Sequence, residues 1–392
     1  MKKPQGKLDI SGWLKREKWS IAVLCAAALV FVLACLWLRP ETDASAQAAE
    51  YVEYEKAVVT DVLTDNTASD PASDGAWRGE QTLLAEVKTG QYAGETMMVY
   101  NYVGPVYGVP LKEGDGVSLT ISTHAGGDHA ATVYEYNRIP ALLAVIAAFF
   151  LVTALVGRKT GIKSLIGLVI TVLCLFRILL PLLMCGAPTL PAVFLVCAYI
   201  AVVSFTILGG AHRKSVCAML GTVAGTAAAL LFGLLAQALA RVDGLRLADV
   251  QPLLQLRQTG TPIGLRGLLV GGVVISALGA VMDVAMSISS ALEEVHGANP
   301  ALGRRELFRS GMNIGRDMVG TMTNTLILAF LGSGFTLILY LYSLGLAKYQ
   351  LFTSAYAAIE VISGVASSIG MILAIPVTAL ISAAMIARRG EK

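Results

Sequence analysis

Charged residues are scarce in this sequence. Only 15% of its 392 residues are Asp, Glu, Lys or Arg, whereas soluble domains carry about 25%. The formal net charge is only +3, which makes no case for a nucleic-acid-binding protein. With 55% hydrophobic residues, the composition indicates a multi-span membrane protein instead.

Cysteine is missing from the one polar region of the chain, residues 41–138. That region therefore has no disulfide framework and no cysteine-based metal site. The six cysteines all lie in or at the ends of apolar segments, where we expect them to be small buried hydrophobic groups. They are Cys25, Cys35, Cys174, Cys185, Cys197 and Cys217.

The common catalytic motifs are also missing. There is no Gly-x-Ser-x-Gly, no His-Glu-x-x-His and no phosphate-binding Gly-x-x-x-x-Gly-Lys-Ser/Thr loop. The Gly-x-Gly-Asp context of intramembrane aspartyl proteases is absent around Asp283 and Asp317. A glycine-rich turn holds His124, Asp128 and His129. A plain surface loop is a simpler interpretation of this turn than a metal site. We expect no enzyme activity, no cofactor and no metal, so an intramembrane enzyme is only a distant third interpretation.

Long uncharged runs are what the chain does have, and each can cross a hydrocarbon core of about 30 Å. We predict an all-α membrane bundle of about eight transmembrane helices, with a small all-β domain after the first. The expected division is 1–40 (basic N-terminus and first helix), 41–138 (β domain) and 139–392 (seven-helix membrane domain). The predicted spans are 19–38, 139–156, 164–184, 191–208, 216–240, 267–289, 312–344 and 354–387.

The first apolar segment has two interpretations. Ala44-Ser45-Ala46 resembles a signal-peptide cleavage site, but the run 19–38 is longer than the usual h-region of about 7–15 residues. We favour an uncleaved first span. Six Lys/Arg against two acids in residues 1–18 place the N-terminus in the cytoplasm.

Loop charges give the remaining topology, with the C-terminus also cytoplasmic. The exception is the loop 241–265, which carries three arginines on the predicted outside and has room for a surface helix. The basic residues predicted inside are Arg158, Lys159, Lys163, Arg213, Lys214, Arg304, Arg305, Arg309, Arg388 and Arg389.

The polar region 41–138 has 16 Asp/Glu against five Lys/Arg and would lie outside the membrane. Five short runs rich in β-branched residues and tyrosine predict a small barrel or sandwich. We expect residues 65–79, rich in Asp, Ser and Ala, to form a loop. The five predicted strands are 57–63, 81–88, 95–102, 117–123 and 131–136.

A polar stripe runs along the seventh predicted span. At about 100° per residue, Asn313, Asp317, Thr321 and Asn324 share one helical face. An intramembrane carboxylate is usually kept for a purpose and turned toward a protein interior or a cavity. The structural alternative is that Asp317 pairs with a neighbouring arginine, Arg316 or Arg309, at the membrane surface.

The sixth span carries a second stripe, of glycines and serines around Asp283. Packing between helices explains its small residues but not the carboxylate. From the same membrane surface, Asp283 would lie about 10 Å deep and Asp317 about 7–8 Å deep. The functional interpretation is a cation or proton site. The stripe consists of Gly272, Ser276, Gly279, Asp283, Ser287 and Ser290.

Two further patterns concern other spans. Glu360 in the eighth span is at a similar outer depth to Arg177 in the third. We consider both a structural Arg177–Glu360 ion pair and a carboxylate that titrates during transport.

In the fifth span, small residues recur at every fourth position from Gly221 to Gly233, which predicts close helix packing and nothing more.

The blocks GAVMDVAMSISS (279–290) and SGMNIGRDMVGTMTNTLILAFLG (310–332) resemble the YibE/F family of bacterial multi-span membrane proteins. The resemblance implies a protein of the bacterial cytoplasmic membrane with an outer β-type module, and it brings no established activity. The positions that it singles out are Asp283, Asn313, Asp317, Thr321, Thr323 and Asn324.

Our first interpretation is a transporter-like or permease-like protein. Asp283, Asp317 and Asn324 would line a cytoplasm-facing cavity, with Glu360 nearer the outside. The alternative is a membrane scaffold, in which the outer β domain binds a protein partner and the stripes only pack helices. Beyond the lipid bilayer, the sequence leaves a homo-oligomer open and excludes a nucleic-acid partner.

Overall fold

The computed structural model describes residues 18–37, 51–123, 129–210, 212–247, 249–345 and 348–387. The chain forms two compact units: Glu41–Val152 is one, and Met1–Pro40 together with Thr153–Lys392 is the other. The candidate cleavage motif at 44–46 lies outside the described residues, as do His124 and Asp128 of the histidine-containing turn.

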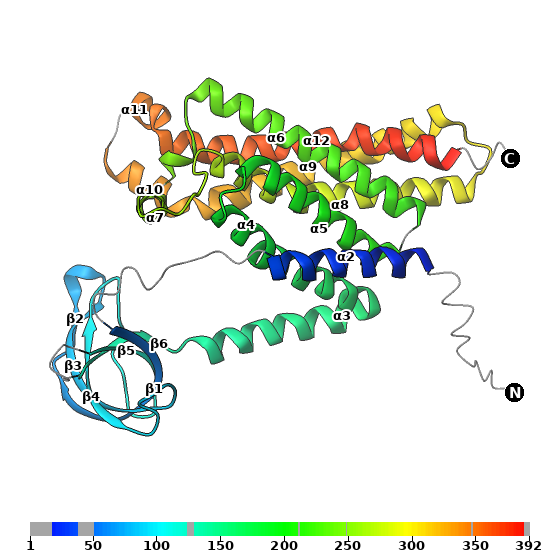
Figure 1. Ribbon diagram of the computed structural model, residues 1–392. Helices are drawn as coiled ribbons and strands as arrows, with labels where there is room; N and C mark the ends of the chain where they lie inside the picture. The colour runs from blue at the N-terminus through cyan, green and yellow to red at the C-terminus, as the bar shows by residue number, and fades with distance from the viewer. Residues whose placement is uncertain are drawn as a thin grey trace, which may run out of the picture. The chain divides into compact units, whose positions relative to one another are not determined.

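The polar region is a β-barrel (Figure 1). Its strands run in the order β1-β5-β6-β4-β3-β2, and an additional pairing of β1 with β3 closes a ring of five. All neighbours are antiparallel except β4 and β6. This is the Greek-key connectivity of an OB-fold barrel. The strands are β1 (Tyr51–Asp65), β2 (Ala68–Asp70), β3 (Ala76–Val87), β4 (Thr96–Val103), β5 (Gly116–Thr123) and β6 (His129–Tyr136).

Alternation of side chains builds the barrel core. On β3, every second residue from Gln81 to Val87 is buried. This is the two-residue period of a strand with one face against a core. Leu83, Leu119 and Ile121 are fully enclosed. Because the β1–β3 pairing closes the sheet, the barrel is the right one of the two predicted alternatives.

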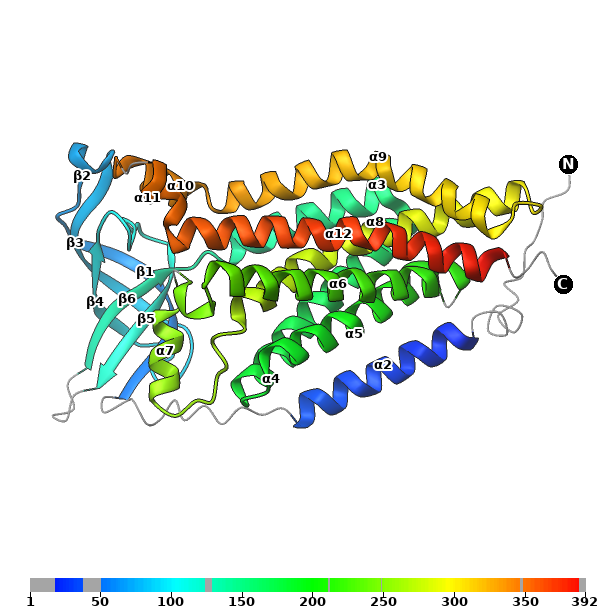
Figure 2. The ribbon, with the colours of Figure 1, turned by 90° about the horizontal axis from the view of Figure 1, so that it is seen from above.

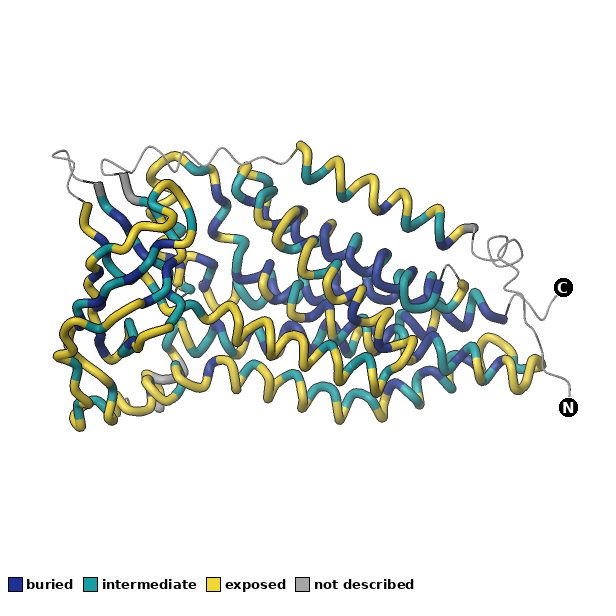
Figure 3. The backbone as a smooth tube through the Cα atoms, turned by 90° about the horizontal axis from the view of Figure 1, so that it is seen from below, coloured by how far each residue is buried: buried dark blue, intermediate teal, exposed yellow. Residues whose placement is uncertain are grey.

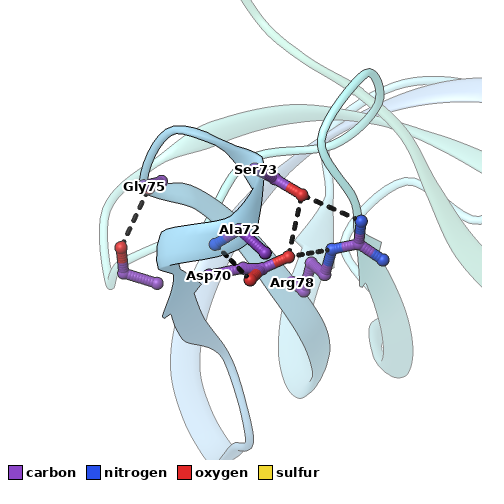
Figure 4. A network of polar contacts seen from close by, with 6 residues as sticks. Asp70, Ala72, Ser73, Gly75 and Arg78 are labelled. Atoms are coloured by element: carbon purple, nitrogen blue, oxygen red, sulfur yellow. Dashed lines mark hydrogen bonds and ion pairs between the residues drawn. The ribbon is translucent and has the colours of Figure 1, made fainter.

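The prediction of a loop at 65–79 is wrong, because this stretch is a regular hairpin of β2, a 3-10 turn (Pro71–Ser73) and the start of β3. The Asp70 carboxylate holds the turn of this hairpin together (Figure 4). One carboxylate oxygen accepts from the Ala72 amide at 2.9 Å; the other accepts from the Ser73 hydroxyl at 2.8 Å and pairs with Arg78 Nε at 2.8 Å. A composition rich in Asp and Ser thus signals a side-chain-capped turn here.

This hairpin is expected to open in acid. The Ser73 hydroxyl, then the Ala72 amide and Arg78, hold the pKa of Asp70 below its usual 3.8. Because the folded-state pKa is the lower one, the stabilisation is complete above about pH 4 and is lost as the pH falls through the folded-state value. The Gly75 amide donates to the Asp70 carbonyl at 3.0 Å and therefore reports on this turn. Its hydrogen exchange, corrected for the intrinsic rate, should show lower protection at pH 3 than at pH 6.

Asp70→Asn should remove that difference in protection. The matched control is Asp74→Asn in the same turn, where Asn suits the left-handed backbone at φ 55°. The control should keep the pH dependence of the parent protein. Equal protection of Gly75 at both pH values in the parent would contradict the prediction.

The other described residues are mainly helical, and in Figures 1 and 2 the long helices α6, α8, α9 and α12 run side by side. The short exposed helix α7 occupies the loop 241–265, in which the sequence left room for a surface helix. The helices are α2 (Lys18–Trp37), α3 (Ile139–Cys174), the π-helix η3 (Leu175–Leu179), α4 (Leu180–Met184), α5 (Thr189–Gly209), α6 (Arg213–Ala240), the 3-10 helix η4 (Gly244–Arg246), α7 (Gln251–Gln258), α8 (Leu268–Ala298), α9 (Arg304–Ser333), α10 (Phe335–Ser343), α11 (Lys348–Thr353) and α12 (Ala355–Ala387).

Six helical segments among the described residues are long and apolar enough to cross a membrane, or seven if the bent pair α9–α10 is one span. One segment, Ile139–Met184, has 46 residues, about twice what a span needs. Its helical geometry breaks at Arg158, with φ 48° and ψ −131°. A Cβ on Gly161 would lie 2.3 Å from the Thr153 carbonyl oxygen, although these residues would be about 12 Å apart in a straight helix. The chain therefore turns back here, between the two predicted spans.

The small residues of α6 pack against α12, as predicted. A Cβ on Gly221 would lie 2.0 Å from Thr378 Oγ1, and one on Gly225 would lie 2.6 Å from Ala374 Cβ. Ala229 is fully buried against Gly370. Small side chains at this spacing let two helix backbones approach closely.

Large apolar side chains cover much of the outside of the bundle, as a bilayer requires. Figure 3 shows exposed residues along the helices, and leucines such as Leu155, Leu231 and Leu239 are about two-thirds exposed or more. The cysteines follow the prediction only in part. Cys174, Cys197 and Cys217 are buried, Cys35 is intermediate, and Cys25 and Cys185 are exposed.

Candidate functional site

The polar stripe of α9 points away from the bundle. Leu307, Gly311 and Gly315 form the buried side of this helix. A Cβ on Gly315 would lie 2.1 Å from Ile375 Cγ2, so α9 rests directly on α12. The opposite side carries the predicted residues, and all four are exposed: Asn313, Asp317, Thr321 and Asn324.

The arginine beside this stripe does not pair with Asp317. Arg316 Nη1 instead donates to Asn313 Oδ1 at 3.4 Å, a long hydrogen bond. Among the described residues, neither Arg316 nor Arg309 forms an ion pair with Asp317. Thr323 lies off the stripe, and its buried hydroxyl has no hydrogen-bond partner in the described part of the chain. The suggested ion pair of Asp317 with Arg316 or Arg309 is thus not found among the described residues.

The stripe of α8 is exposed in the same way. Val270, Val281 and Ile288 are fully buried on one side of the helix, and the stripe lies opposite them. Gly272, Ser276, Gly279, Asp283 and Ser287 are all exposed, and Ser290 is half-buried. A Cβ on Gly272 or Gly279 would meet nothing within 4 Å. Among the described residues of the helical unit, no other helix therefore packs against these two glycines.

Glu360 occupies a different place, at the junction of α9 and α10. Its side chain is half-buried on α12, and a Cβ on Gly334 would lie 3.1 Å from the Glu360 carboxyl carbon. Arg177 is exposed on the π-helix η3. No ion pair joins Arg177 to Glu360 among the described residues, so the structure does not bring these two predicted partners together.

The junction is a bend between two apolar helices. The axes of α9 and α10 differ by 60°. The break lies at Gly334, whose amide donates to the Phe330 carbonyl at 3.0 Å and whose carbonyl accepts from the Ile338 amide at 3.0 Å. Sequence reasoning treated 312–344 as one overlong span, although the triplet Gly332-Ser333-Gly334 carries a signal for such a break.

A bend of this kind brings two helix ends to one position in an apolar part of the chain. At a helix end the regular pattern of backbone hydrogen bonds stops. Half-helix ends of this type bind ions and charged substrate groups in secondary transporters. Glu360 adds a carboxyl group to this position, so the junction combines an acidic side chain with two helix ends.

The comparison with protein families agrees with the membrane part of the chain. Residues 145–388 match the model of the YibE/F-like protein family. The chain belongs to the YibE/F family. Both blocks that carry the resemblance, 279–290 and 310–332, fall inside the match, and so does the Glu360 junction. The β-barrel of this YibE/F protein lies outside it, and no curated protein and no solved structure matches the chain.

Proposed function

We propose that this YibE/F membrane protein is a cation-coupled or proton-coupled permease, with Glu360 at the broken span α9–α10 as its ion-binding carboxylate. The supporting observation is the position of Glu360 at Gly334, where the span is broken. No Lys or Arg forms an ion pair with Glu360 in the described part of the chain. A carboxylate inside a membrane costs at least about 2.5–3.5 kcal/mol unless its charge is compensated. A bound proton or cation provides that compensation.

The stripes of α8 and α9 extend this proposal to the other side of the membrane. Asp283 and Asp317 are exposed on the outer faces of their helices. Lipid tails cannot solvate these carboxylates. The proposal therefore includes a second copy of the chain over this surface, so that Asp283, Asp317 and Asn324 line a path between subunits. A path between two subunits thus takes the place of the cavity within one chain that was expected from the sequence.

The test is ion flux into proteoliposomes that contain the full-length protein and a pH-sensitive or cation-sensitive dye. With imposed H⁺, Na⁺ or K⁺ gradients, Glu360→Gln is expected to lower the flux at least about tenfold, because the group that binds the ion has lost its charge. Asp283→Asn should act in the same direction. The matched control is Glu294→Gln, an exposed carboxylate beyond the predicted sixth span, which should transport at the parent rate.

Two results would overturn the permease proposal. One is the absence of any flux above empty liposomes in the parent protein under all three gradients. The other is a parent-like flux in Glu360→Gln at equal protein content.

A membrane scaffold is the second candidate, because the α8 stripe is open to a neighbour at Gly272 and Gly279. In this case the β-barrel binds a partner and the stripes only hold subunits together. A protein that lacks residues 41–138 would then fail to restore function in a null strain, whereas the Asp283→Asn protein would restore it fully. That pair of results would favour the scaffold and contradict the permease.

A further inference from the structure

A cavity of about 990 Å³ lies between α2, α5 and the part of α3 that follows Arg158. This volume is near the upper end of the roughly 300–1,000 Å³ that ligand sites occupy. Most of its wall is apolar, and α2 contributes a long side of it. Representative wall residues are Ile21, Leu24, Phe31, Ile166, Ile170 and Leu173.

One end of the cavity is polar, and three helices place their polar residues at that end. α2 contributes Ser20 near its start, α3 contributes Lys163, and the start of α6 contributes Lys214 and its N-cap residue His212. Glu293 is the acidic group beside them, with Oε2 3.5 Å from Lys214 Nζ. With two lysines against one carboxylate, the mouth is complementary to an anion.

The N-terminus of α6 adds to this positive potential. His212 is the N-cap residue, and its side chain makes no capping hydrogen bond. Its Nδ1 lies 2.8 Å from the Gly209 carbonyl and must donate to it, because a carbonyl only accepts. The first amides of α6 are therefore left without a side-chain cap at the mouth, and uncapped amides at a helix N-terminus attract phosphate groups.

An unsatisfied hydroxyl marks the same place. Ser215 is fully buried, and its Oγ has no hydrogen-bond partner among the described residues. This oxygen lies 2.5 Å from the position that a Cβ would take on Gly209, and Met286 Cε is 3.3 Å from the same position. Gly209 and Met286 both line the cavity. The unpartnered Ser215 hydroxyl thus lies directly behind the wall that Gly209 forms at the polar end, without itself lining the cavity.

The depth of the cavity matches one leaflet. On α2 its wall runs from Ser20 to Val32, about 18 Å of helix, and on α3 from Lys163 to Leu173, about 15 Å. Half of a hydrocarbon core is about 15 Å. A molecule that fills this space needs an anionic head at the polar end and a chain as long as one leaflet.

We propose that this cavity binds an anionic phospholipid from the leaflet on the side of the basic loops, with its phosphate at the N-terminus of α6 and an acyl chain along α2. A free phosphate would leave the apolar wall exposed to water. Residues 1–17 carry five Lys/Arg against two acids. The chain's own N-terminus is therefore positive, like the mouth of the cavity, and is not a complementary occupant. A second copy would bring its basic loops to the same place. The lipid is the occupant that fits both the charge and the length.

Native mass spectrometry of the full-length protein tests this assignment, with phosphatidylglycerol and phosphatidylcholine of identical acyl chains as probes. The parent should retain phosphatidylglycerol preferentially. The double change Lys163→Gln and Lys214→Gln should weaken it about 25-fold, since each basic group near a membrane surface contributes about fivefold. The matched control is Lys159→Gln with Arg305→Gln, which removes two exposed charges that do not line the cavity.

A second pair of variants tests the apolar part without altering charge. Ala28→Phe fills the cavity and should displace phosphatidylglycerol, whereas Ala26→Phe changes an exposed residue of α2 outside the wall and should not. Equal retention of the two lipids, or equal losses in the lysine variant and its control, would identify annular lipid only and overturn the proposal. Displacement of phosphatidylglycerol by inorganic phosphate would also overturn it, in favour of a site for a small anion.

Discussion

Gly225→Leu is expected to lower the free energy of unfolding by about 3 kcal/mol or more, and to remove most of the folded protein from the membrane. Gly225 lies where α6 crosses α12. A Cβ there would lie 2.6 Å from Ala374 Cβ and 2.7 Å from Val281 Cγ1. The space on the other side is equally closed, because a Cβ on Gly370 would lie 3.0 Å from the Gly225 carbonyl oxygen.

No rotamer of leucine relieves this overlap, because the contact begins at the Cβ atom. The two helices must separate, and α12 also carries α9 and packs against α8. The measurement is the fraction of a fluorescent fusion that elutes as a single folded species in detergent, followed by its thermal unfolding.

The matched control for this prediction is Gly279→Leu on the exposed stripe of α8, where a Cβ would meet nothing within 4 Å. It makes the same chemical change in a predicted span and should leave the single chain folded. A Gly225→Leu protein as abundant and as stable as the parent would contradict the close crossing of α6 and α12.

Gln81→Leu has the second-largest expected effect, a loss of about 3 kcal/mol in the stability of the β-barrel. Gln81 is only 1% exposed. Its Nε2 donates to Asp65 Oδ2 at 2.9 Å and to the Leu111 carbonyl at 3.1 Å. Its Oε1 accepts from the Leu111 amide at 2.8 Å and from Asn101 Nδ2 at 2.9 Å.

Leucine has a similar size but can make none of these four bonds. It would leave both backbone groups of Leu111 and one hydrogen of the Asn101 amide without partners inside the barrel, at about 1–3 kcal/mol for each buried group. Hydrogen exchange of the full-length protein should show faster exchange at Leu111 and along β4.

The control for Gln81 is Gln91→Leu. The amide of Gln91 is exposed and makes a single bond to Glu53 Oε2 at 2.9 Å. This change should alter exchange only around its own turn. Unchanged protection at Leu111 in Gln81→Leu would show that the network contributes little to the stability of the barrel.

Local sequence patterns determined the outline of this protein. Uncharged runs of span length gave the helices, and alternating strands separated by Gly/Asp turns indicated the β domain. The spacing of Gly221 and Gly225 was enough to predict close packing. These properties depend on the chemistry of neighbouring residues and on the helical or strand period, which a sequence displays directly.

The candidate site was predictable only as a set of residues. Helical periodicity places Asp283 and Asp317 on stripes of small and polar residues, and this is correct as local geometry. The periodicity does not say which side of each helix meets the bundle. In the structure, α9 rests on α12 through Gly315, so its stripe is turned outward.

By itself, the sequence determined the apolar helical segments, the family blocks and the polar character of the α8 and α9 faces. Only the tertiary structure decided which way those faces point, that β1 pairs with β3 to close the barrel, and that Glu360 lies at the break at Gly334. It also placed Lys163 and Lys214 at the mouth of one cavity. The physical reason is the same throughout. These features depend on contacts between segments far apart in the chain, and no local period encodes them.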